Sequence, residues 1–86
     1  MRVRIPTPLR SYTSQQSWVE AAGASVADVL ADLDRQFPGL RFRVVDEQGR
    51  LRRHVNVYVN QHRTRDLSTS LSHDDELTIM QALSGG

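Results

Sequence analysis

With 86 residues, of which 38% are hydrophobic and 24% charged, the chain has the composition of one small folded domain rather than of a disordered or fibrous protein. It contains no cysteine, which excludes disulfides, thiolate metal sites and a cysteine nucleophile. The formal net charge of +1 is too small for a nucleic-acid footprint, and without a membrane-length apolar run or a signal peptide pattern the expected location is cytoplasmic.

The first predicted strand covers residues 2–5. Polar and β-branched side chains alternate there, so Val3 and Ile5 are expected to face the core. The two prolines that follow end this strand because neither can donate a ladder hydrogen bond. The polar stretch 11–16 is expected to be a loop.

A second strand is predicted at about residues 16–21. Val19 and Ala21 share one of its faces, and Trp18 and Glu20 share the other. A shift of one residue in register would exchange these faces. Whether Trp18 lies in the core or on the surface therefore stays open.

The clearest helix begins at Ser25, an N-cap candidate with Asp28 three residues later. Asp32 and Asp34 are two residues apart and do not face each other on a helix, so we interpret them as solvated rather than as an acid–base pair. Residues 38–39, a Pro-Gly pair, end the helix. Its core-facing stripe is Val26, Val29, Leu30, Leu33 and Phe37.

Residues 40–45 are compatible with two structures. Phe42 and Val44 alternate as in a strand, whereas Leu40 and Val44 have the spacing of a helical turn. Neither alternative is preferred. Residues 46–49 (Asp-Glu-Gln-Gly) are expected to form a turn.

The strongest strand pattern spans residues 52–60, and a last strand is predicted at 76–80. Residues 61–66 are expected to loop out, with Leu67 and Leu71 anchoring a short turn beneath them. The inward positions of the two strands are Val55, Val57, Val59, Leu77 and Ile79.

The single apolar helix stripe needs one sheet face to cover, which predicts an α+β roll with the helix on one side only. The opposite sheet face is then left to solvent or to a partner. Because arginine, aromatic residues and methionine are enriched in interfaces, we interpret this face as a docking surface. The alternative is a scatter of tolerated exposed residues. The side chains expected there are Arg4, Trp18, His54, Tyr58, Thr78 and Met80.

The sequence contains little that could catalyse a reaction. Its histidines, at 54, 62 and 73, are eight and eleven residues apart, which matches no common ligand spacing. No serine lies in a nucleophile elbow and no glycine-rich phosphate loop follows a strand. The acidic run 74–76 is better explained as a solvated turn than as a cation site. We therefore expect no enzyme activity, no metal site and no bound cofactor.

Three arginines, at 50, 52 and 53, form a local basic cluster. They could contact an anion or a partner, although a solvated hairpin end is the better explanation.

The last five residues, 82–86, form a small-residue segment that ends on Gly85 and Gly86. Glycine has no Cβ, so such a segment is expected to be flexible and thin enough to enter a narrow cleft. Its free carboxylate is then the candidate reactive group, and a frayed end is the alternative. The chain divides into a domain at 1–81 and this tail at 82–86.

Three segments carry a resemblance to a known family: residues 55–60 (Val-Asn-Val-Tyr-Val-Asn), residues 75–79 (Asp-Glu-Leu-Thr-Ile) and the tail 82–86 (Ala-Leu-Ser-Gly-Gly). With them the chain resembles the ubiquitin-like β-grasp sulfur carriers, the family of the molybdopterin-synthase small subunit and the thiazole-synthesis carrier. Residues 5–10 and 53–60 make it most similar to the actinobacterial carriers that serve cysteine synthase. Asn60-Gln61 replaces the frequent Asn-Gly, and His73-Asp74-Asp75 replaces Asp-Gly-Asp.

The resemblance implies a β-grasp fold with a mixed four- to five-stranded sheet and one main helix on one face. It also implies that an adenylating partner consumes ATP to activate Gly86, which then carries sulfur as a thiocarboxylate to a synthase, most simply one for cysteine. Gly85, Ser84 and Leu83 would thread into the partner, and the free carrier would be a monomer. Carriers for molybdopterin, thiazole or another thiolated metabolite, a protein modifier and a tail-independent binding module are the alternatives.

Overall fold

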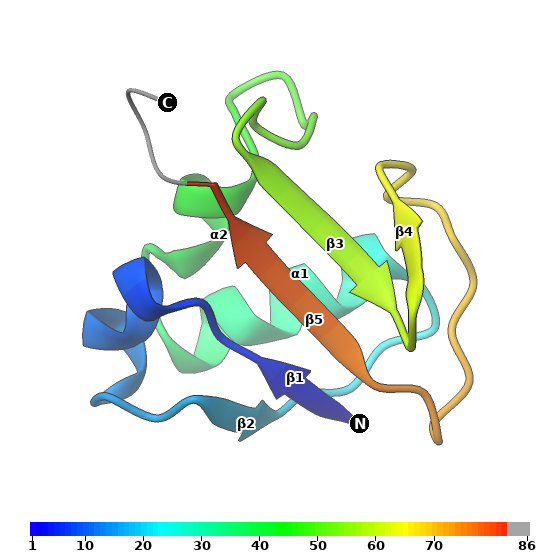
Figure 1. Cartoon of the computed structure of the whole chain (residues 1–86), viewed down its shortest axis with the longest axis horizontal. Helices are drawn as coiled ribbons and strands as arrows, with labels where there is room; N and C mark the ends of the chain where they lie inside the picture. The colour runs from blue at the N-terminus through cyan, green and yellow to red at the C-terminus, as the bar shows by residue number, and fades with distance from the viewer. Residues whose placement is uncertain (83–86) are drawn as a thin grey trace.

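The computed structural model describes residues 1–82, so the predicted tail residues Leu83, Ser84, Gly85 and Gly86 lie outside the described residues. Five strands, two α-helices and one 3-10 helix follow one another along the described part (Figure 1). In chain order they are β1 (Arg2–Arg4), η1 (Thr7–Thr13), β2 (Trp18–Glu20), α1 (Val26–Gln36), α2 (Leu40–Val44), β3 (Val55–Val59), β4 (His62–Thr64) and β5 (Leu77–Gln81).

The strands form one mixed sheet in the order β2-β1-β5-β3-β4. β1 pairs with β5 in parallel, whereas the other three pairings are antiparallel. Helix α1 crosses one face of this sheet, and the other face carries no helix (Figure 1). The predicted α+β roll with a helix on one side is therefore confirmed. The last strand in sequence is the central strand in space.

Helix α1 forms as its sequence predicts. The Ser25 hydroxyl accepts a hydrogen bond from the Asp28 amide at 3.2 Å, which satisfies one of the free N–H groups of the first turn. The helix ends at Gln36, and Gly39 has a φ of +95° that a glycine adopts without strain. Four residues of the predicted stripe are buried and Phe37 packs partly buried against them.

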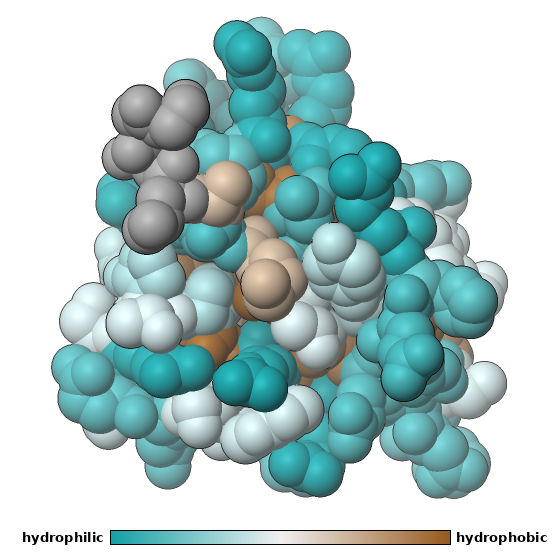
Figure 2. Space-filling model, in the orientation of Figure 1, coloured by the Kyte–Doolittle hydropathy of each residue, from teal (hydrophilic) through white to brown (hydrophobic). Residues whose placement is uncertain are grey.

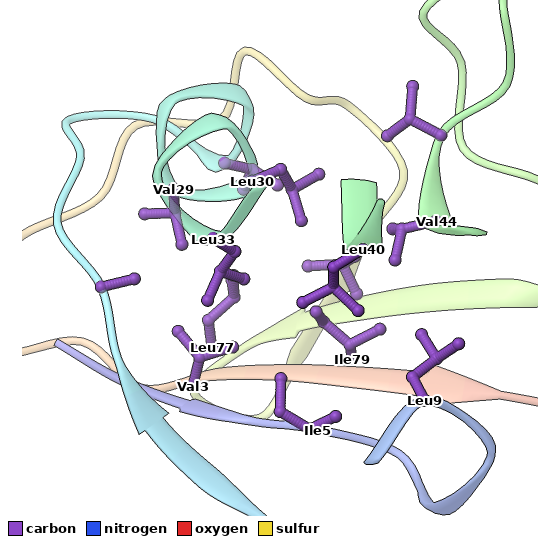
Figure 3. Packing of buried hydrophobic residues seen from close by; sticks show 14 of the residues in the cluster. Val3, Ile5, Leu9, Val29, Leu30, Leu33, Leu40, Val44, Leu77 and Ile79 are labelled. Atoms are coloured by element: carbon purple, nitrogen blue, oxygen red, sulfur yellow. The ribbon is translucent and has the colours of Figure 1, made fainter. Parts of the chain in front are cut away.

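The core lies between α1 and the sheet. Val3 and Ile5 from the β1 segment, and Leu77 and Ile79 from β5, all point toward the helix, where they meet side chains such as Leu33 (Figure 3). All five are fully buried. Removing such a side chain from water is worth about 1.5 to 3 kcal/mol each, so the alternation read from the sequence describes the main stabilising contacts.

The predicted loop at 11–16 is wrong in its first part, because the 3-10 helix η1 continues to Thr13. Leu9 anchors this helix in the core. The Thr13 hydroxyl is also buried and lies within hydrogen-bond distance of the Arg10 and Gln16 carbonyls, at 3.2 and 2.8 Å. The polar composition of residues 11–16 therefore gave no indication that Thr13 is buried or that the 3-10 helix is held in the core by Leu9.

The ambiguity at 40–45 is resolved in favour of a helix. Leu40 and Val44, one turn apart on α2, are both buried, whereas Phe42 is 54% exposed. The Asp34 carboxylate accepts hydrogen bonds from the Gly39 and Arg41 amides at 3.1 and 3.2 Å. Asp34 therefore caps α2, and the interpretation of this residue as merely solvated is corrected.

The predicted loop at 61–66 is also wrong in its first part, because His62–Thr64 form the edge strand β4, paired antiparallel with β3. Its polar side chains gave no alternating hydrophobic signal, since an edge strand with exposed faces needs none. Leu67 and Leu71 pack against the core as predicted. None of the helices within residues 1–82 is long and apolar enough to cross a membrane.

Candidate functional site

The open sheet face carries the row of side chains that the sequence predicted. Arg4 lies opposite Trp18 in β2 and Thr78 in β5, and Thr78 lies opposite Tyr58 in β3. Because side chains alternate along a strand, these four residues point away from α1. Met80 follows two residues along β5 on the same face and is 50% exposed.

His54 is the exception among the predicted docking residues. It lies in the turn that precedes β3, outside the ladder, and its carbonyl accepts a hydrogen bond from the Ala82 amide at 2.8 Å. His54 therefore sits beside the point where the chain leaves the sheet, rather than within the row on the open face.

A groove of about 710 Å³ runs along the open face. Arg4, Trp18 and Met80 contribute to its walls, together with Pro6 and Pro8 at the start of η1. Tyr58 does not line it and stands one strand away. Figure 2 shows this face, where pale and tan groups over the middle of the sheet are bordered by hydrophilic surface.

Trp18 lies on this outer face, which settles the alternative that its sequence left open. The guanidinium carbon of Arg2 is 4.1 Å from the centre of the indole ring, and that of Arg4 is 5.6 Å away. Both distances fit cation–π attraction. Arg2 was not among the predicted surface residues, although its position two residues before Arg4 on one strand was a usable signal.

A second group of side chains surrounds the base of the tail. A hollow of about 230 Å³ is lined by Phe42, Arg43, Arg52, His54 and Gln81. The Arg52 guanidinium carbon lies 4.6 Å from the centre of the Phe42 ring, and its Nε donates a hydrogen bond to the Phe42 carbonyl at 2.8 Å. Sequence reasoning did not connect these residues, because α2 and the loop before β3 meet only in the fold.

The start of β5 is held by a hydrogen-bonded clip. The Asn60 side chain donates to the Asp75 carboxylate at 3.0 Å and accepts from the Glu76 amide at 3.1 Å. The Ser72 amide also donates to Asp75 at 2.8 Å. The Ser72 amide and then the Asn60 side chain lower the pKa of Asp75, because both hydrogen bonds favour the ionised carboxylate. The turn after β3 and the turn before β5 are therefore tied together.

The titratable groups do not form a catalytic centre in the described part of the chain. Within residues 1–82, no group of three histidine, aspartate or glutamate side chains could hold a metal ion. Asp32 accepts hydrogen bonds from Arg35 and from the Ala22 amide, which lower its pKa, and it is a structural anchor rather than a free acid.

Comparison with known proteins gives concordant matches over nearly the whole chain. The model of the ThiS family matches residues 3–86. The sulfur carrier protein CysO of Mycobacterium tuberculosis is 38% identical, over 98% of this chain and 96% of its own length. Small archaeal modifier protein 3 of Haloferax volcanii is 30% identical, over 100% of this chain and 98% of its own length.

Solved structures agree with these relatives. A chain in the crystal structure of the Amycolatopsis orientalis BexX/CysO complex matches with a TM-score of 0.91 at 39% identity, covering 99% of this chain and 98% of that one. With the strand order described above, this match confirms the expected ubiquitin-like β-grasp fold.

Proposed function

The chain belongs to the ThiS family, and from this membership we propose that it is a sulfur carrier protein that works in cysteine biosynthesis. It acts as a protein co-substrate of other enzymes and not as an enzyme itself. Its acceptor group is the carboxylate of Gly86, and Gly85, Ser84 and Leu83 lead that group into a partner's active site. The carrier works in the cytoplasm, where it is a monomer when free. It meets two partners there, an adenylating enzyme that activates Gly86 and a synthase that accepts the sulfur.

The position of β5 is the observation that carries this proposal. β5 is hydrogen-bonded on both sides, by β1 and β3, and its pairing extends to Gln81. One further hydrogen bond fixes the Ala82 amide to the His54 carbonyl. The residues before the glycines therefore follow in sequence a strand that is paired on both sides, which gives a partner a rigid handle a few residues before the acceptor group.

The proposed chemistry balances as follows. A carboxylate oxygen of Gly86 attacks the α-phosphate of ATP on the adenylating partner, and pyrophosphate leaves. Hydrosulfide then attacks the acyl carbon of the adenylate, AMP leaves, and a thiocarboxylate remains on Gly86. With a persulfide donor, a thiol reductant must also cleave the acyl disulfide. Because the chain has no cysteine, no internal thiol can intercept the activated acyl group.

The open sheet face supports the docking part of the proposal. Arg4, Trp18, Tyr58 and Met80 present arginine, aromatic and thioether groups, which are enriched where proteins bind one another. His54 adds a contact at the base of the tail. The partners are an adenylating enzyme and a sulfur-acceptor synthase. The BexX/CysO complex, in which a CysO protein associates with another protein, is consistent with such a role.

Labelling tests the proposal directly. We expect that incubation with the adenylating enzyme of the source organism, ATP and sulfide makes the protein reactive toward a thiol-selective alkylating reagent. In a chain without cysteine, fragment mass spectrometry should place the label on Gly86. Intact mass is not sufficient, because replacing oxygen by sulfur is nearly isobaric with oxidation of Met1 or Met80. A variant lacking Gly86 is the control, and a label that never appears on the terminal peptide contradicts the proposal.

A ubiquitin-like modifier is the second candidate, because small archaeal modifier protein 3 is 30% identical to this chain. All eleven basic residues are arginine, so lysine-linked polymers of the chain are excluded and single attachment remains. Conjugates in which Gly86 is joined to lysines of other proteins, found by mass spectrometry after a tryptic digest, would favour this candidate. Binding that survives removal of Gly86 would instead indicate a tail-independent binding module.

A further inference from the structure

The charges of this chain are separated along its sequence. Residues 41–65 contain seven arginines and two acidic residues, whereas the other 61 residues contain four arginines and eight acidic residues. The formal charges of the two parts are therefore +5 and −4, which the net charge of +1 conceals. The positive segment forms α2, the loop after it, β3 and β4.

Part of this positive segment borders the base of the tail. Figure 1 shows α2 and the loop before β3 on either side of the end of β5. The hollow beside Gln81 includes Arg43 from α2 and Arg52 from that loop. Arg53 follows Arg52 directly and is exposed. Of the cluster at 50–53 that the sequence singled out, Arg52 therefore lines the hollow beside Gln81 and Arg53 follows it, whereas Arg50 lines a separate hollow with Arg65 and Leu67.

These arginines are available for an outside partner. Among residues 1–82, the ion pairs that arginines form are those of Arg2 with Glu76 and of Arg35 with Asp32. Neither Arg43 nor Arg53 takes part in one within this range. The nearby carboxylate of Asp46 is held by backbone amides of its own turn, and only Glu47 adds a further negative charge to that turn.

The same surface also has an apolar centre. Phe42 and Met80 are the exposed large hydrophobic residues of the described chain, at 54% and 50%; Phe42 lines the hollow, and Met80 lies in β5 one residue before Gln81, in the wall of the groove. Arg52 is held over the Phe42 ring by stacking and by its hydrogen bond, so it is already oriented. Gln81 also lines the hollow. Its side-chain oxygen is buried and accepts no hydrogen bond from the described residues.

We propose that Phe42, Arg43, Arg52 and Arg53 form a basic collar around the base of the tail that docks an acidic surface on the partner protein receiving Gly86. This inference rests on the proposed function, since it names the partner surface for the same tail. Positive charge beside the tail attracts a negatively charged surface on the partner. This attraction speeds the encounter of the two proteins and fixes their relative orientation. A long nucleic acid fits less well, because the remainder of the molecule carries −4 and repels a polyanion.

Single charge reversals test the collar. Arg43→Glu and Arg53→Glu alter exposed side chains that make no hydrogen bond or ion pair within residues 1–82. Arg50→Glu makes the same change at an exposed arginine that lines neither the groove on the open face nor the hollow beside Gln81, and it is the matched control. The adenylating enzyme of the source organism is the binding partner, and association and dissociation rates are measured by stopped flow at low and high salt.

We expect Arg43→Glu and Arg53→Glu each to slow association about fivefold at low salt, with the deficit shrinking at high salt, because contacts at the rim of an interface act mainly on the association rate. Arg50→Glu should change it less than twofold. Equal association rates for all three variants would overturn the collar, and so would a wild-type protein that does not bind the enzyme. Transfer RNA serves as a nucleic-acid probe: the collar would also be overturned if Arg43→Glu and Arg53→Glu weakened binding to this RNA and left binding to the enzyme unchanged.

The two proposals fail separately. If binding falls in the collar variants but Gly86 is never thiocarboxylated, the collar stands and the sulfur carrier function is refuted. If Gly86 is thiocarboxylated and the collar variants bind like the wild type, the function stands and the collar is refuted.

Discussion

The clip at Asn60 yields the sharpest prediction about the fold that carries the tail. Asn60 has a φ of +57°, in the left-handed region, and its side chain makes two hydrogen bonds to the start of β5. Its backbone amide also donates to the Glu76 carbonyl at 2.7 Å. Asn60 therefore performs two separable tasks: it tolerates the strained backbone conformation, and it fastens the turn after β3 to the strand that leads into the tail.

Two substitutions separate these tasks. Asn60→Gly keeps the left-handed conformation and removes both side-chain hydrogen bonds, which at an exposed site contribute about 0.5 kcal/mol each or somewhat more. We therefore expect a loss of about 1 to 2 kcal/mol. Asn60→Ala loses the same bonds and, unlike the glycine variant, keeps a Cβ in the left-handed region without the local hydrogen bonding by which asparagine offsets its cost, about 1 kcal/mol more. The expected loss is then about 2 to 3 kcal/mol.

Urea unfolding followed by far-ultraviolet circular dichroism measures these differences as changes in the free energy of unfolding. For a domain of this size, about 2 to 3 kcal/mol corresponds to a Tm lowered by roughly 10 to 20 °C. Gln61→Ala is the control, since Gln61 is the exposed neighbour in the same turn and should change stability by less than about 0.5 kcal/mol. An Asn60→Gly variant as unstable as Asn60→Ala, or an Asn60→Ala variant as stable as the wild type, would refute the reasoning.

Three further predictions concern stability. Leu33→Ala, at a fully buried position between α1 and the sheet, should lower the free energy of unfolding by about 2 to 5 kcal/mol in urea titrations. Gly23→Ala should lower Tm more than Gly49→Ala, because a Cβ at Gly23 meets the Val29 amide nitrogen at 2.6 Å whereas Gly49 has open space and only its φ of +79° to strain. The lowered pKa of Asp75 means that its contribution to stability is present above pH 4 and is lost as the pH falls through its folded-state pKa, so Asp75→Asn should flatten the acid side of the stability profile between about pH 5 and 2.

The strands and the main helix were predictable because burial repeats with a period. Val3, Ile5, Leu77 and Ile79 alternate with polar residues, and every one of them is buried. Helix α1 added a capping signal at Ser25 to its apolar stripe. Local sequence was sufficient wherever one face of an element meets the core.

The missed elements lacked such a period. Strand β4 is an exposed edge strand, so it contains only polar residues and shows no alternation of polar and apolar side chains. It is recognised only by its pairing with β3. Helix α2 is one turn long, and Leu40 with Val44 was too little to exclude a strand until the Asp34 cap was seen. Tertiary contacts decided both cases.

The candidate site divides in the same way. Alternation predicted which residues share the open sheet face, because β-strand geometry fixes it. The collar was out of reach, since it depends on Arg52 folding back onto Phe42 of α2, ten residues earlier, and the sequence did not decide that this segment is a helix. His54 illustrates the difference. Strand alternation with Tyr58 predicted that it lies on the open face, whereas the structure places it in the turn before β3, at the base of the tail.

Under the proposed function, the groups that stabilise the fold and the group that reacts do not overlap. The core residues lie between α1 and the sheet, whereas the reacting carboxylate is carried on the chain beyond β5. A core substitution such as Leu33→Ala should then reduce the fraction of folded carrier without changing the rate at which each folded molecule is thiocarboxylated. Loss of Gly86 should have the opposite signature, because β5 keeps both neighbours and the unfolding free energy is retained. Measured together, the two variants distinguish a carrier, which loses its function with Gly86 although its stability is retained, from a binding module, whose binding survives the loss of Gly86 and falls only when the fold is destabilised.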